Sequence, residues 1–145
     1  MSTTALSDTQ VLAWARLVRA AQSMLGAIEG DLKTAGFPPL VWYDALLELK
    51  RAGTCGLRPF ELQHAMLLEQ YGVSRLADRL IKVGYVERFE CKEDGRGQVL
   101  RITAAGRALL KKMWPAYRAA IVAHFAGKLT CADAETLATI LAKLK

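Results

Sequence analysis

The side chains with the most distinctive chemistry lie on one predicted helix, expected over Glu69 to Val83. Its apolar positions, Val73, Leu76, Ala77 and Leu80, share one face. The remaining faces carry polar and charged groups: Gln70, Tyr71, Ser74, Arg75, Asp78, Arg79 and Lys82. An arginine can donate two hydrogen bonds to guanine, and a glutamine can pair in two places with adenine. The pattern fits a helix that enters a major groove, and an ordinary solvated amphipathic helix has the same pattern.

A second basic group lies between two β-prone segments, Tyr85 to Phe89 and Gln98 to Ile102. The connection from Lys92 to Gly97 is polar and contains glycine, so the two segments read as a hairpin with an extended tip. Lys92 and Arg96 lie at that tip, where a basic side chain can reach a minor groove or a row of phosphates. A polar hairpin kept soluble by its charges is the alternative. Two short helices followed by a basic hairpin are nevertheless typical of winged modules that bind DNA.

Apolar residues at helical spacing predict further helices on both sides of this module. The first runs from Ser7 to about Lys33, and Ser7 and Gln10 have the spacing of a capping box. The others are expected over Pro39 to Arg51, Pro59 to about Leu67 and Thr103 to about Ala126, and a last helix begins at Thr130 or Cys131. The order α-α-α-α-β-β-α-α predicts a mainly α fold with one small sheet.

Charge is distributed unevenly along the 145 residues. Residues 1–50 contain 4 basic and 5 acidic side chains, a net charge of −1, whereas residues 51–145 contain 16 and 9, a net charge of +7. A positive region suits a polyanion such as DNA, although an ordinary basic surface has the same composition. The hydrophobic fraction of 52% excludes a disordered chain, and the length predicts one domain.

Several classes of site have no support in the sequence. Cys55, Cys91 and Cys131 form no C-x-x-C pair, and His64 and His124 lie in no metal-binding pattern, so neither a metal nor another cofactor is expected. The chain has no phosphate-binding loop and no nucleophile motif, which argues against an enzyme. It also has no secretion signal and no apolar run of membrane-spanning length. A cytoplasmic protein with reduced thiols is expected.

The segment from Leu57 to Leu110 resembles the DNA-binding lobe of the MarR family of bacterial transcriptional regulators. The resemblance is carried by Leu62, Ser74-Arg75-Leu76, Asp78-Arg79-Leu80, Gly84-Tyr85-Val86-Glu87-Arg88, Asp94-Gly95-Arg96 and Ile102-Thr103-Ala104-Ala105-Gly106. The spacings from Leu62 to Gly84 and from Asp94 to Thr103 match the family, and the flanking helices match its overall plan. The chain departs from the family's usual Ala-Glu and Gly-Leu types at Gln63-His64 and Leu67-Leu68.

The resemblance implies a winged helix-turn-helix with flanking helices that form a dimer. One MarR-like domain would cover 1–145, with dimerisation helices in 1–36 and 107–145 and a DNA-binding lobe in 37–106. The dimer would bind a pseudo-palindromic operator. Arg96 would enter the minor groove, and Asp78 and Asp94 would brace the wing, Asp78 through an ion pair with Arg96. The apolar stripe Leu137, Ile140, Leu141 and Leu144 fits a dimer contact, and packing within one chain is the alternative.

Aromatic residues on the flanking helices and the second helix are candidates for binding a small effector. The set comprises Trp14, Trp42, Tyr43, Trp114 and Tyr117, with Arg16, Arg19 and Arg51 as possible anchors for a carboxylate. Flat phenolic or other aromatic acids are often effectors in the resembled family, and core packing is the alternative role of these rings. The sequence thus predicts a dimeric repressor released by an aromatic ligand. The alternative is a winged protein–protein interaction module without DNA contacts.

Overall fold

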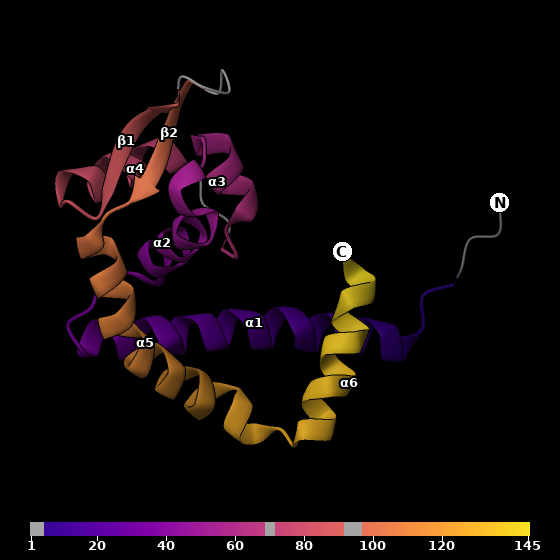
Figure 1. The fold of residues 1–145 in the computed structure, drawn as a ribbon. Helices are drawn as coiled ribbons and strands as arrows, with labels where there is room; N and C mark the ends of the chain where they lie inside the picture. Colours follow the sequence, from indigo (N-terminus) through magenta and orange to yellow (C-terminus); the bar gives the residue numbers. More distant parts are fainter. Residues whose placement is uncertain (1–4, 69–71, 92–96) are drawn as a thin grey trace. The chain divides into compact units, whose positions relative to one another are not determined.

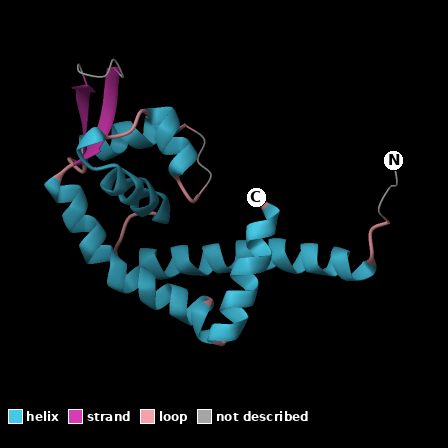
Figure 2. Cartoon of the chain, turned by 45° about the vertical axis from the view of Figure 1, so that its right-hand side comes forward, coloured by secondary structure: helices cyan, strands magenta, loops and turns pink. Residues whose placement is uncertain are grey.

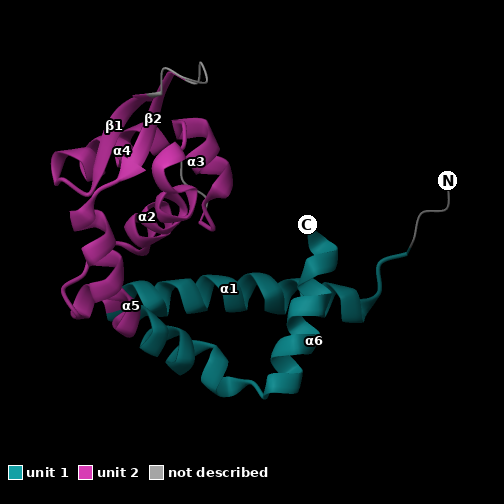
Figure 3. Ribbon diagram, in the orientation of Figure 1, with its two compact units in different colours: residues 1–31, 117–145 teal, residues 32–116 magenta. Residues whose placement is uncertain are grey.

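The computed structural model describes residues 5–68, 72–91 and 97–145. These residues form two compact units (Figure 3). Unit 1 comprises residues 1–31 and 117–145, and unit 2 comprises residues 32–116. Helices α1 (Asp8–Thr34) and α5 (Ala104–His124) contribute to both units. Helices dominate the described chain, and the sheet has two strands (Figure 2). The mainly α fold expected from the sequence is confirmed.

Unit 2 has the element order of a winged helix-turn-helix (Figure 1). Its helices and strands are α2 (Leu40–Ala52), the 3₁₀ turn η1 (Gly53–Cys55), α3 (Pro59–Ala65), α4 (Val73–Lys82), β1 (Val86–Cys91) and β2 (Gly97–Ile102). The two strands are antiparallel, with Val86 opposite Ile102. Leu57 pairs with Leu100 through two backbone hydrogen bonds of 3.0 and 2.7 Å, which ties the segment before α3 to the hairpin.

The core of unit 2 takes apolar side chains from α2, α3, α4 and the hairpin, and from the parts of α1 and α5 that belong to this unit. The largest fully buried side chains are Leu32, Leu40, Leu46, Leu49, Leu62, Leu80, Val99 and Met113. The four apolar residues predicted to share one face of α4 are all buried, as expected from the helical period. Because this face holds α4 against the core, the opposite face is fixed toward solvent.

Helix α4 is shorter than the sequence indicated. The predicted start at Glu69 is wrong, because Gly72 directly precedes the helix with a φ of 75°, a left-handed conformation that cannot continue an α-helix. The helix ends at Lys82, and Gly84 follows with a φ of 86°, as the expected left-handed cap. Gln70 and Tyr71 lie outside the described residues.

Unit 1 contains α1, the second half of α5, the 3₁₀ turns η2 (Ala126–Lys128) and η3 (Ala142–Leu144), and α6 (Cys131–Leu141). The predicted capping box at the start of α1 is confirmed: the Ser7 amide donates to Gln10 Oε1 and the Gln10 amide to Ser7 Oγ. An equivalent pair, Thr130 and Asp133, opens α6. Near their C-terminal ends, α1 and α5 are joined by a hydrogen bond of 2.8 Å between Asp31 Oδ2 and His124 Nε2.

Two further features of unit 1 are the point at which α5 ends and the exposure of α6. Helix α5 ends at His124 rather than Ala126, because Phe125 leaves the helical backbone conformation. No residue of α6 is buried in the single chain. Among the helices described, none combines the length and the apolar character of a membrane-spanning segment.

Candidate nucleic-acid interface

The exposed face of α4 presents hydrogen-bond donors close to the start of the helix. Ser74 and Arg75 lie in its first turn and Arg79 one turn later, and all three side chains are exposed. They come from the same short helix whose other face packs into the core, so their direction is set by that packing. A helix that offers hydroxyl and guanidinium donors in this way has the chemistry to contact base edges and phosphates in a major groove.

A side-chain ion pair connects α4 to the first strand of the hairpin. Arg88 Nη2 on β1 donates to Asp78 Oδ1 over 2.7 Å, and both side chains are exposed. Sequence reasoning assigned Asp78 to Arg96 and gave Arg88 no role, although Arg88 stands in the Gly84–Arg88 stretch that carried the family resemblance. Lys92, Asp94 and Arg96 lie outside the described residues, so their roles at the wing tip stay predictions. What the structure adds is a fixed link between the candidate reading helix and the base of the hairpin.

One buried carboxylate supports the turn that leads toward α4. Asp44 is only 6% exposed, and its two oxygens accept the amides of Leu67 at 2.9 Å and Leu68 at 2.6 Å. These bonds join α2 to the segment after α3, 23 and 24 residues further along the chain. Sequence reasoning considered α2 for its apolar positions and missed Asp44. An acidic residue inside the apolar run from Leu40 to Leu49 was the available signal, because buried charges require partners.

The aromatic candidates divide between the two units. Trp42 contacts Tyr85 edge-to-face with ring centres 6.2 Å apart, and Tyr43 stacks on Trp114 with centres 6.4 Å apart, all within unit 2. Burial raises the pKa of the Tyr43 phenol above 10.0, and the Arg51 guanidinium lowers it by less.

The remaining ligand candidates, Trp14, Arg16 and Tyr117, belong to unit 1, where Trp14 is 68% exposed. Because the candidates are split in this way, a ligand site formed by the whole aromatic set stays a prediction.

Comparisons with known proteins point in one direction. The sequence model described as "MarR family" matches residues 35–97. The Multiple antibiotic resistance protein MarR of Escherichia coli (strain K12) is 27% identical over 94 residues. The chain spans 65% of the length of this curated relative, and the match covers 65% of the chain itself.

Solved structures extend the likeness to nearly the whole chain. AbsC, a MarR family transcriptional regulator from Streptomyces coelicolor, superposes with a TM-score of 0.84 at 25% identity, covering 98% of this chain and 95% of AbsC. Sco3205, a regulator of the same family and organism solved in complex with DNA, has a TM-score of 0.83 at 26% identity, covering 97% and 91%. Because these matches cover nearly the whole chain, AbsC and Sco3205 are similar to it both in the winged helix-turn-helix and in the flanking helices.

Proposed function

We propose that the chain is a DNA-binding transcriptional regulator of the MarR family of winged helix-turn-helix proteins. The family consists of regulators and not of enzymes, in agreement with the expectation from the sequence. The observation that carries the proposal is the exposed row Ser74, Arg75 and Arg79 on a helix whose opposite face is buried. Sco3205, which is similar over nearly the whole chain, was solved in complex with DNA.

In the proposed complex, α4 lies in a major groove and the hairpin reaches the adjacent minor groove or backbone. Arg75 and Ser74, at the start of α4, contact base edges, and Arg79 contacts a phosphate. The link between Asp78 and Arg88 keeps the base of the hairpin in register with α4. Binding then depends on two contributions, a salt-sensitive one from phosphates and a sequence-specific one from base edges.

A titration of duplex DNA at several salt concentrations tests this function. The DNA should include the region upstream of the protein's own gene and a scrambled duplex of equal length. Affinity should fall steeply with salt, and Arg75→Ala should cost about 1–3 kcal/mol on the preferred site. Lys111→Ala is the matched control, because Lys111 is an exposed cation on α5 rather than on α4. Absence of DNA binding at low salt contradicts the proposal. If Arg75→Ala loses the same affinity for both duplexes, Arg75 contacts only phosphates and no base edge.

We propose further that two copies of the chain bind a pseudo-palindromic operator. The support is the apolar surface of unit 1 in the single chain, where Ile140 is 48% and Leu144 is 64% exposed. An exposed apolar stripe of this kind is usually covered by a partner. The alternative function, a winged protein–protein module without DNA contacts, predicts that Arg75 and Arg96 can be replaced without loss of any partner.

We also propose that the protein acts in the cytoplasm as a repressor released by a small aromatic acid. Stacked and edge-to-face rings in unit 2 support an aromatic ligand, although the same contacts serve core packing. A ligand acts only if it prefers the conformation that does not bind DNA, with a coupling of about 1–3 kcal/mol. Thermal-shift measurements with phenolic acids, paired with operator release, test this idea. Stabilisation without release makes the acid a ligand but not an inducer.

A further inference from the structure

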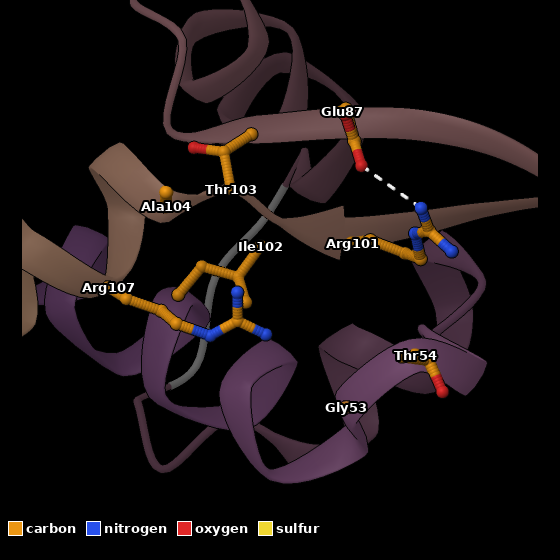
Figure 4. A pocket seen from close by; sticks show the side chains of 8 residues that line it. All are labelled: Gly53, Thr54, Glu87, Arg101, Ile102, Thr103, Ala104 and Arg107. Atoms are coloured by element: carbon orange, nitrogen blue, oxygen red, sulfur yellow. Dashed lines mark hydrogen bonds and ion pairs between the residues drawn. The ribbon is translucent and has the colours of Figure 1, made fainter.

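A cavity in unit 2 lies apart from the residues assigned to DNA and from the aromatic candidates. Its volume is about 260 Å³, and it is lined by η1, the adjoining ends of the two strands and the first turn of α5 (Figure 4). Ligand pockets for drug-sized molecules span roughly 300–1,000 Å³, so this cavity suits a smaller molecule. None of the predicted effector residues lines it.

Two arginines give the cavity its charge. Figure 4 shows Arg107 entering from the side of α5 and Arg101 from β2. Arg101 is held in place, because its guanidinium donates to Glu87 Oε1 over 3.2 Å and lies 3.8 Å from the centre of the Phe89 ring. Among the described residues, by contrast, the exposed Arg107 has no acidic partner within ion-pair distance. A guanidinium without a counter-ion at the mouth of a cavity attracts an anion.

The backbone adds to this positive potential. Thr103 and Ala104, at the start of the 21-residue helix α5, also line the cavity. The Gly106 amide in this first turn already donates to Thr103 Oγ1, so what α5 adds is the partial positive charge that the helix dipole places at its start. Thr54 lines the cavity from η1, opposite α5, and the largely buried Ile102 lies between the two arginines.

The balance of charge limits which anion fits. Two arginines and Glu87 give the lining a net charge of +1. An anion with one negative charge neutralises this net charge, whereas a second negative charge on the anion would be repelled by Glu87. The hairpin also separates this cavity from the candidate DNA surface. Glu87 and Arg101 are directly opposite each other in the ladder and share one face, whereas neighbouring Arg88, which pairs with α4, points to the other.

We propose that this cavity binds a small organic monocarboxylate. The carboxylate accepts hydrogen bonds from Arg107 and from Arg101, where it competes with Glu87, and its apolar body lies against Ile102. Thr54 and the start of α5 complete the lining. This site is independent of the proposed aromatic effector site and of DNA binding.

Binding is tested on the whole protein without DNA. The protein is titrated with three compounds in a two-dimensional amide NMR experiment. Butyrate serves as the monocarboxylate, butyramide serves as its uncharged analogue, and inorganic phosphate serves as the dianion. Butyrate should shift the amide signals of Thr54, Ala104 and Arg107 in a saturable way, and butyramide should not. Arg107→Gln should weaken butyrate at least tenfold, whereas Lys111→Gln, which removes a cation on α5 outside the cavity, should change it less than twofold.

Glu87→Gln provides a test in the opposite direction. Removing the competing carboxylate should increase the affinity for butyrate. It should also allow phosphate to bind to the variant, whereas the wild type should not bind phosphate. Three results overturn the proposal: shifts that avoid the cavity, equal binding of butyrate and butyramide, or wild-type affinity in Arg107→Gln. Because no readout involves DNA, a failure here leaves the regulator proposal untouched, and the reverse holds as well.

Discussion

At the scale of single residues, Asp44 is the buried polar side chain of the described part of unit 2. Asp44→Ala removes the acceptor for the amides of Leu67 and Leu68 and should lower the free energy of unfolding by about 1–3 kcal/mol. Operator affinity should fall as well, because these amides belong to the turn that precedes α4. Urea unfolding and a DNA titration measure the two effects.

A matched control for Asp44 is available on the same helix. Glu48→Gln removes the charge of the 15% exposed Glu48 from its pair with the 66% exposed Arg51, and it should cost less than Asp44→Ala, because a glutamine oxygen can still accept a hydrogen bond from Arg51. Asp44→Asn keeps one acceptor oxygen and should fall between the wild type and Asp44→Ala. An Asp44→Ala protein as stable as the control would show that the two amides find other partners.

Arg96 at the wing tip should matter more to DNA binding than its single charge suggests. A narrow minor groove concentrates negative potential and favours an inserted arginine, and lysine cannot reproduce the planar fork. Arg96→Ala should weaken operator binding strongly, and Arg96→Lys should rescue it only in part. Gel-shift titrations measure the operator affinities of both variants. If Arg96→Ala binds the operator as tightly as the wild type does, the wing is a solvated hairpin that does not contribute to DNA binding.

Asp78 has two candidate partners, Arg88 on β1 and Arg96 at the wing tip, and mutations can tell the two pairs apart. Asp78→Ala should cost less than about 1 kcal/mol in stability, because its pair with Arg88 is exposed. Its effect on operator binding should resemble that of Arg96→Ala if Asp78 aims the wing tip, with dimerisation intact. A double-mutant cycle with Arg88→Ala decides the matter, since strong coupling to Arg88 and none to Arg96 would assign Asp78 to the base of the hairpin.

At the scale of elements, the start of α5 packs closely against the end of the α4–β1 turn. A Cβ at Gly106 would contact the Tyr85 carbonyl oxygen and lie 2.7 Å from Ile102 Cγ1. Gly106→Ala should therefore destabilise unit 2 by about 1–3 kcal/mol, measured by urea or thermal unfolding.

The control for Gly106 changes stability in the other direction. Gly30 lies inside α1, and a Cβ added there would meet no atom within 4 Å outside its own helix backbone and chain neighbours. Gly30→Ala should therefore stabilise the chain by about 0.4–1 kcal/mol. If Gly106→Ala behaves like Gly30→Ala, the contact between α5 and Tyr85 is loose.

At the scale of the whole molecule, the apolar surface of α6 predicts the oligomeric state. Ile140→Lys with Leu141→Lys should convert a dimer into a monomer, because each substitution places a charge on an exposed apolar face that the proposed partner covers. Analytical ultracentrifugation gives the mass, and operator affinity should fall with loss of the second half-site. Thr139→Lys, on the opposite side of α6, adds a positive charge without touching this face. A dimer that survives the double substitution would place the interface elsewhere.

The sequence by itself determined the order of the elements and the polarity of their faces. Capping boxes, left-handed glycines and the apolar period of α4 are properties of neighbouring residues, so they can be read locally: Ser7 with Gln10, Gly84, and Val73 to Leu80 all agree with the structure. The start of α4 could not be read in this way, because the apolar period alone does not show that Gly72 adopts a positive φ.

Only the tertiary structure decided which distant residues meet. Asp44 lies 23 residues before its first partner, Asp78 lies 10 residues from Arg88, and the cavity joins η1 to α5 across the hairpin. Such contacts depend on how helices and strands pack around the core, and the sequence pattern of each element is compatible with several partners. The DNA-facing side of α4 was therefore predictable from its own residues, whereas the contacts that support α4 and the cavity between η1 and α5 were not.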